Sequence, residues 1–139
     1  MKTIGYYRLR NKNKIEGYAK EMNGVTYFKG YNEFTWHETS LPFDTIDIGI
    51  DVLDKRNRRL FTNDIVLYKV SCKPFLRSGF VAYEPNKREF GIIDQQSFHF
   101  TPFYIDNLCL FDKDKLEVIH ICLQKKKLVK VCKWFLERF

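Results

Sequence analysis

The stretch that decides the fold of this chain is 53–68, which reads LDKRNRRLFTNDIVLY. It opens with a polar turn rich in basic residues, and Asn63 and Asp64 form a second tight turn. Asn tolerates left-handed backbone, and an Asp side chain can accept a hydrogen bond from a nearby backbone N–H. Ile65 to Tyr68 follow at once and are apolar on both faces, as in a strand inside a barrel or sandwich. We therefore predict that a small curved sheet begins here.

Length and composition favour one domain rich in β-structure. The chain has 139 residues, and 45% of them are hydrophobic. A chain of this size buries roughly two-thirds of its unfolded surface, which suffices for a hydrophobic core without disulfide or metal cross-links. Aromatic residues are abundant (13 Phe, 8 Tyr, 2 Trp), and this enrichment favours sheet. We expect a single domain over 1–139, which divides further, if at all, into a subdomain over 1–40 and a barrel with its final helix over 41–139.

The first thirty residues predict an antiparallel meander. Its expected strands are 4–10, 15–20 and 25–28. Asn23-Gly24 is the strongest hairpin signal of the chain, because both residues accept the positive φ angles of a tight turn. The segment 38–42 is the most linker-like part of the sequence, so any subdomain boundary is expected there.

The middle of the chain predicts a bent barrel of short strands. In 44–52 the isoleucines 46, 48 and 50 alternate with polar residues, which is typical of a half-buried strand with one apolar face. Further strands are expected at 65–68, 79–84, 90–93, 97–104 and 116–123. Short strands with a turn every eight to twelve residues are typical of small barrels, and this run resembles an SH3-like barrel. The last of these strands is apolar on both faces and is expected to be central.

The final segment has a different period. Its apolar residues recur at helical spacing and are Leu128, Val131, Cys132, Phe135, Leu136 and Phe139. They predict an amphipathic helix that packs over the barrel. The expected fold class is therefore mainly β (α+β), with an N-terminal meander, a small SH3-like bent barrel and a C-terminal amphipathic helix.

Several segments resemble the YopX-like proteins of phages and prophages. The family's recurrent pattern lkDknGkeIyegDIV is followed by a gxVxy strand and a late EVIGNIYENPEL segment. The similar residues here are 54–57, 60–61, 64–66, 79–83 and 117–119, and the opening 2–10 is loosely similar to the family's start. Arg58 and Asn63 replace the family's turn glycines, and the GNIYENP ending is absent. The resemblance implies a phage or prophage accessory protein, without an established reaction or catalytic residues.

Net charge, apolar runs and cysteine spacing indicate the cellular environment in which the protein is expected. The net charge of +7, from 24 basic and 17 acidic residues, favours solubility and affinity for polyanions and argues against mimicry of DNA. No apolar run reaches the roughly 18 residues of a membrane span, and the N-terminus lacks an apolar signal core. The four cysteines form no CxxC pair, so reduced thiols are expected. We expect a protein of the host cytoplasm with no membrane partner.

Two clusters combine positive charge with planar groups, which suits phosphate binding and stacking on bases. One is the turn 55–59, and the other is the polar face of the predicted helix, where Trp134 lies one helical turn from Lys130 and from Arg138. The predicted nucleic-acid or partner-binding residues are Lys55, Arg56, Arg58, Arg59, Lys126, Lys127, Lys130, Lys133, Trp134 and Arg138. The structural alternative is an ordinary solvated face, with Trp134 folded over the barrel edge.

The predicted function is non-enzymatic binding of nucleic acid through this basic and aromatic surface. A first alternative is a protein partner, either a host factor or a second copy of the chain, with Trp134 as an aromatic anchor. A second alternative is a metal-dependent hydrolase. Its candidate carboxylates are Asp44, Asp47, Asp51, Asp54 and Asp64. Asp54 and Asp64 occupy turn positions, however, where Asp is typically bonded to backbone.

No cofactor or metal is expected. His120 and Cys122 share one strand face, and Cys109 and Cys132 lie elsewhere in the chain. Structural zinc sites normally show paired ligands at both ends of the site, and that spacing is missing. The two residues are more simply read as side chains of a central strand.

Overall fold

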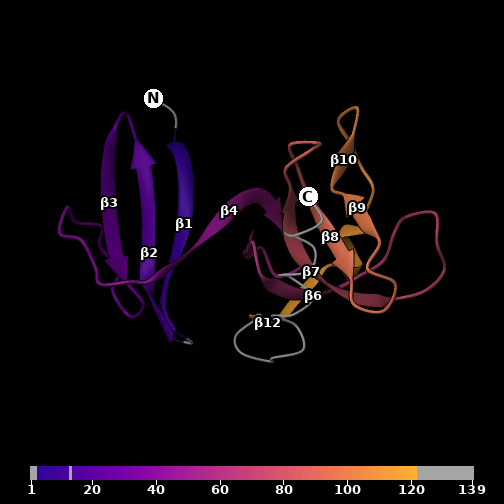
Figure 1. The fold of residues 1–139 in the computed structure, drawn as a ribbon, viewed down its shortest axis with the longest axis horizontal. Coiled ribbons are helices and arrows are strands. Elements are labelled where there is room, and N and C mark those ends of the chain that lie inside the picture. Colours follow the sequence, from indigo (N-terminus) through magenta and orange to yellow (C-terminus); the bar gives the residue numbers. More distant parts are fainter. Residues whose placement is uncertain (1–2, 13, 122–139) are drawn as a thin grey trace. The chain divides into compact units, whose positions relative to one another are not determined.

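A computed structural model describes residues 3–12 and 14–121 and shows a protein that is mainly β (Figure 1). The predicted C-terminal helix lies outside the described residues. The elements are β1 (Thr3–Asn11), β2 (Lys14–Met22), β3 (Val25–Gly30), β4 (Thr45–Leu53), β5 (Arg59–Phe61), β6 (Asp64–Tyr68), β7 (Arg77–Glu84), β8 (Glu89–Asp94), β9 (Phe100–Pro102), β10 (Tyr104–Ile105), β11 (Leu108–Cys109), the short 3-10 helix η1 (Lys113–Lys115) and β12 (Glu117–Ile121). Within these described ranges, no helix is long and apolar enough to cross a membrane.

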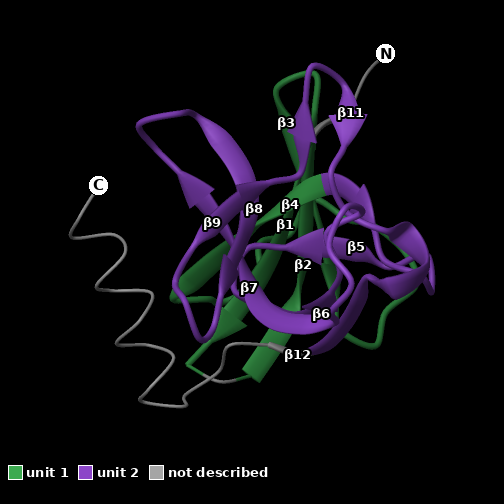
Figure 2. Ribbon diagram, turned by 90° about the vertical axis from the view of Figure 1, so that its right-hand side faces the viewer, with its two compact units in different colours: residues 1–50 green, residues 51–139 purple. Residues whose placement is uncertain are grey.

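The chain divides into two compact units, unit 1 over residues 1–50 and unit 2 over residues 51–139 (Figure 2). The division falls inside β4 and not at 38–42, where the sequence favours a linker. The reason lies in hydrogen bonding, because Thr45 to Ile48 pair with β1 and so belong to the first sheet.

Unit 1 contains antiparallel strands in the order β3-β2-β1-β4. The predicted hairpin is confirmed, since Asn23 and Gly24 have φ angles of 53° and 80° and Met22 pairs with Val25 across them. Leu9 and Ala19 are the buried apolar residues on one face of this sheet. The three predicted N-terminal strands are therefore present, and each is slightly longer than the sequence pattern indicates.

The predicted orientation of β4 is wrong in its first half. Ile46 and Ile48 are 49% and 41% exposed, whereas Asp47 between them is fully buried. The alternation of the sequence is real, but alternation alone does not tell which face is covered. Here β1 places Arg8 opposite Asp47, and the ion pair occupies the buried side. From Ile50 onward the isoleucine face is buried as predicted.

Unit 2 is built on an antiparallel sheet in the order β12-β6-β7-β8-β9. The predicted second turn is confirmed, because Asn63 has a φ of 72° and β6 follows it directly. The core of the unit contains Val66, Phe80, Val81, Ile92, Ile93, Phe103 and Leu116, all at most 2% exposed. β12 stands at the end of the strand order, so the predicted central position of this strand is wrong for the part that the structure describes.

Candidate functional site

Asp54 organises the predicted basic turn from its inside. Its buried carboxylate accepts the backbone N–H groups of Arg56 and Arg58, each at 2.9 Å, and that of Val118 at 3.1 Å. The Arg58 guanidinium donates a further bond at 3.0 Å. Burial alone raises the pKa of Asp54, but these hydrogen bonds outweigh it and hold the pKa below its usual value. The prediction that Asp54 serves the backbone is confirmed.

The other basic side chains of this turn are also paired with carboxylates. Lys55 Nζ and Arg56 Nη2 lie 3.2 Å and 3.3 Å from the two oxygens of Glu117. Arg59 Nη1 lies 2.9 Å from Asp51 Oδ1. The turn therefore sets four cations against the three carboxylates of Asp51, Asp54 and Glu117, so it presents little surplus positive charge.

The remaining predicted binding residues lie outside the described part of the chain. They are Lys126, Lys127, Lys130, Lys133, Trp134 and Arg138. The same holds for Cys122 and Cys132 and for the side chain of His120. A basic and aromatic surface is nevertheless present elsewhere.

This surface is one face of the sheet in unit 1, and the sequence patterns did not single it out. Cross-strand pairing aligns its side chains in two rows, which read Arg8, Tyr18, Lys29 and Tyr6, Lys20, Tyr27. Directly paired residues, and residues two apart on one strand, share a face of the sheet. Aromatic and basic side chains therefore alternate along and across the strands. We name these six residues together with Trp36 the tyrosine–lysine face.

Trp36 lies over the two lysines of this face. Its ring centroid is 4.6 Å from Lys20 Nζ and 5.0 Å from Lys29 Nζ, which are cation–π distances. Hydrogen bonds of 2.6 Å and 2.9 Å join His37 to Phe28 and fix the segment that carries the tryptophan. Except for the buried Arg8, the side chains of the face are partly exposed. The two lysines are thus held against an aromatic ring, and no carboxylate of the described residues forms an ion pair with them.

A buried ion cluster supports the edge of the tyrosine–lysine face. Arg8 Nε lies 2.7 Å from Asp47 Oδ2, and Arg10 approaches the same carboxylate with Nε at 2.6 Å and Nη2 at 2.8 Å. All three residues are at most 7% exposed. A carboxylate held by two guanidinium groups is a poor ligand for a further cation. Asp47 is thus buried against two arginines, whereas the side chain of Asp51 is fully exposed.

The other aspartates of that hypothesis are likewise engaged. Asp44 accepts the backbone N–H of Lys12 at 3.1 Å and 3.2 Å, and Asp64 accepts that of Phe61 at 2.8 Å. In residues 3–12 and 14–121, no group of three His, Cys, Asp or Glu side chains is placed to hold a metal ion. The structure thus gives the aspartates backbone and ion-pair partners and does not gather them into one site.

Comparison of the chain with protein-family models, curated proteins and solved structures finds no match. The resemblance to YopX-like proteins accordingly stays a prediction. What the geometry defines is a class: a protein that is mainly β, with a partly exposed sheet face on which tyrosines, lysines and a tryptophan are interleaved.

Proposed function

We propose that the protein is a non-enzymatic accessory binding protein of a phage or prophage, and that its tyrosine–lysine face binds single-stranded nucleic acid. One observation carries the proposal: aromatic and basic side chains alternate across three adjacent strands, with Trp36 over Lys20 and Lys29. Unpaired bases stack on aromatic rings, and each stacked base contributes about 1–3 kcal/mol. Lysines between the rings are placed to contact the phosphates that link those bases.

Single strands fit this surface better than duplexes do. A sheet face with aromatic side chains offers ring surfaces to bases that are already unstacked, whereas a duplex hides the faces of its bases inside the stack. Recognition by stacking is tolerant of sequence, because every base has a π-face. We therefore expect binding with little sequence preference and with a strong dependence on salt.

The fold of unit 2 supports a finer assignment as an SH3-like barrel. In the strand order β12-β6-β7-β8-β9, the first strand of this sheet in the sequence, β6, pairs with the last one, β12. The short helix η1 directly precedes β12. The assignment brings no activity with it, since function resides in particular sites and not in the fold. The host cytoplasm is the location we propose for such a protein.

Fluorescence anisotropy with labelled single-stranded oligonucleotides tests the proposal. The double variant Lys20→Ala/Lys29→Ala is expected to bind about tenfold more weakly and to lower the slope of log affinity against log salt by about two, because each lysine contact adds about one. The matched control is Lys87→Ala/Lys115→Ala, which removes the same charge from exposed positions of unit 2. Equal binding by the two double variants, or no binding by the native protein at low salt, contradicts the proposal.

A second function, association with a host protein or a second copy, is favoured by a different observation. Phe34 is 95% exposed, and Ile46 and Ile48 of β4 are about half exposed. Exposed aromatic and aliphatic side chains of this size are frequent interface anchors. Light scattering over a range of concentrations checks self-association, which we expect Phe34→Ser to weaken. A monomer at every concentration, together with identical pull-downs from host lysate by native protein and variant, removes this alternative.

A further inference from the structure

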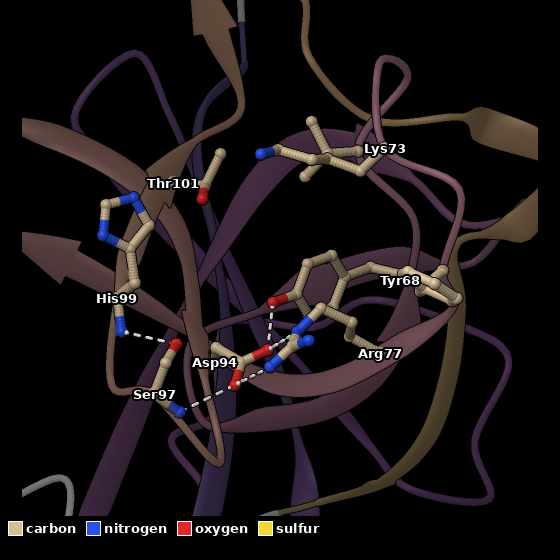
Figure 3. A pocket seen from close by; sticks show the side chains of 9 residues that line it. Tyr68, Lys73, Arg77, Asp94, Ser97, His99 and Thr101 are labelled. Atoms are coloured by element: carbon tan, nitrogen blue, oxygen red, sulfur yellow. Dashed lines mark hydrogen bonds and ion pairs between the residues drawn. The ribbon is translucent and has the colours of Figure 1, made fainter.

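Unit 2 contains a pocket of about 580 Å³ that the proposed function does not use (Figure 3). Tyr68 at the end of β6, Arg77 at the start of β7 and Asp94 at the end of β8 line one part of it. Lys73, from the connection between β6 and β7, lines another part, and so does Thr101 of β9. Its volume is in the range of roughly 300–1,000 Å³ that is usual for small-molecule sites.

Asp94 is fully occupied by protein donors. Its carboxylate accepts the Tyr68 hydroxyl at 2.6 Å and the backbone N–H groups of Gln96 and Ser97 at 2.8 Å and 2.9 Å, and the Arg77 guanidinium binds both its oxygens. Burial alone raises the pKa of Asp94, but these donors hold the pKa far below its usual value. Asp94 and Arg77 thus form a fixed, internally neutral pair, and the carboxylate has no capacity left for a cationic ligand.

Three further polar side chains of the pocket can each donate a hydrogen bond. The Lys73 ammonium, the His99 imidazole and the Thr101 hydroxyl line the pocket, and none of them has a side-chain partner within the described residues. Figure 3 shows Lys73 extending across the pocket toward Thr101, with the His99 ring on the same side. Because Arg77 and Asp94 cancel, the charge of Lys73 is uncompensated among the described residues that line the pocket. Such a pocket favours an anion.

The rest of the wall consists of Ser97, whose hydroxyl accepts the backbone N–H of His99 at 3.3 Å, and of two apolar residues. Val70 and Phe75 line the pocket, and the Phe75 ring is 70% exposed although it lies beside this hollow. A ring in that position provides a surface against which a flat apolar group can stack. The ligand that fits therefore combines an anionic group with a planar or apolar body.

We propose that this pocket binds a phosphate monoester of nucleotide size. Lys73, His99 and Thr101 contact the phosphate, and Phe75 packs against the base. A terminal phosphate has three free oxygens, which matches three separate donors better than the two oxygens of a carboxylate do. Two sources carry this chemistry, a free mononucleotide and the phosphorylated end of a nucleic-acid strand. The site lies within unit 2 and does not depend on the tyrosine–lysine face.

Isothermal titration calorimetry with AMP, and with adenosine as the ligand without phosphate, tests the pocket on the full chain. We expect AMP to bind and adenosine to bind at least tenfold more weakly. Lys73→Ala and Thr101→Val are each expected to weaken AMP binding by about tenfold or more, while the exposed control Lys87→Ala leaves it unchanged. Circular dichroism establishes that the variants fold. Equal affinity for AMP and adenosine, equal behaviour of Lys73→Ala and Lys87→Ala, or no heat with AMP overturns the proposal.

Competition between AMP and oligonucleotides identifies the source of the phosphate. A 5′-phosphorylated oligonucleotide that displaces AMP, when its 5′-hydroxyl counterpart does not, identifies the end of a strand as the source. AMP binding that neither oligonucleotide disturbs identifies a free nucleotide. The variant Lys20→Ala/Lys29→Ala is expected to keep full AMP affinity, so loss of the pocket and loss of the tyrosine–lysine face are distinguishable.

Discussion

The basic turn of unit 2 and the tyrosine–lysine face of unit 1 are the two cationic regions that the structure describes in detail, and they differ in what surrounds the cations. In the turn, Lys55 and Arg56 share Glu117, which is more than sixty residues away in the chain. In the face, Lys20 and Lys29 lie against the ring of Trp36. A dense run of basic residues is therefore poor evidence for free charge, whereas lysines scattered over adjacent strands can form a patch. Three-dimensional neighbours decide which cations a polyanion can reach.

The largest effect is expected from the buried cluster beside the face. Asp47→Ala leaves Arg8 and Arg10 buried without their carboxylate, and removal of one partner of a buried pair typically costs about 3–5 kcal/mol. Urea denaturation measures the free energy of unfolding. Asp51→Ala is the control, since its side chain is fully exposed and little change is expected. Similar unfolding midpoints for the two variants would show that the cluster does not stabilise unit 1.

The turn is expected to depend on Asp54 more than on its cations. Asp54→Ala deprives the backbone N–H groups of Arg56, Arg58 and Val118 of their acceptor, so we expect a loss of about 2 kcal/mol in unfolding free energy. The exposed variant Arg56→Ala should change that free energy far less. A larger loss for Arg56→Ala than for Asp54→Ala would mean that ion pairs, and not backbone bonds, hold the turn.

A binding comparison then sets the two regions against each other directly. Trp36→Ala is expected to reduce affinity for single-stranded oligonucleotides about tenfold, or about 1.4 kcal/mol, because a stacking ring is lost. Trp36→Phe should retain most of the affinity. Lys55→Ala/Arg56→Ala, which alters the turn, should change affinity less than about twofold, since its charges are already paired. Anisotropy titrations at one salt concentration measure the affinity of each variant. A larger loss of affinity for the turn variant than for Trp36→Ala would contradict the proposed role of the tyrosine–lysine face.

The mildest test changes only the pH. The folded-state pKa values of Asp54 and Asp94 lie below their usual values, so both carboxylates contribute stability above the ordinary Asp pKa of about 3.9. That contribution is lost as the pH falls toward the lowered pKa values. We expect these two residues to leave the free energy of unfolding independent of pH between about pH 7 and pH 5, and to lower it below about pH 4. Asp94→Asn should flatten the decline, and an unchanged profile would remove Asp94 from this account.

Much of the strand layout follows from the sequence, because turn chemistry and period-2 patterns are local. Asn23-Gly24 and Asn63 mark turns that the structure contains, with the positive φ angles expected of them. The orientation of β4 does not follow, since Asp47 is buried only through Arg8 and Arg10, which are more than thirty-five residues away. The pairing within the tyrosine–lysine face could have been predicted from the sequence, because a two-residue hairpin fixes Met22 opposite Val25 and hence Lys20 opposite Tyr27. Trp36 was not, since its position depends on the tertiary contact between His37 and Phe28.

The two-residue hairpin between β2 and β3 has a consequence for how this surface is inherited. Side chains of a strand change face with every step, so one residue inserted between Val25 and Tyr27 would send Tyr27 and Lys29 to the opposite side and bring Phe28 round in their place. Such an insertion would remove the contribution of β3 from the interleaved pattern while leaving every amino acid of it in the chain. The surface is specified by a count of positions as much as by composition, and relatives that preserve it are expected to conserve the length of this hairpin more strictly than the identity of any one tyrosine.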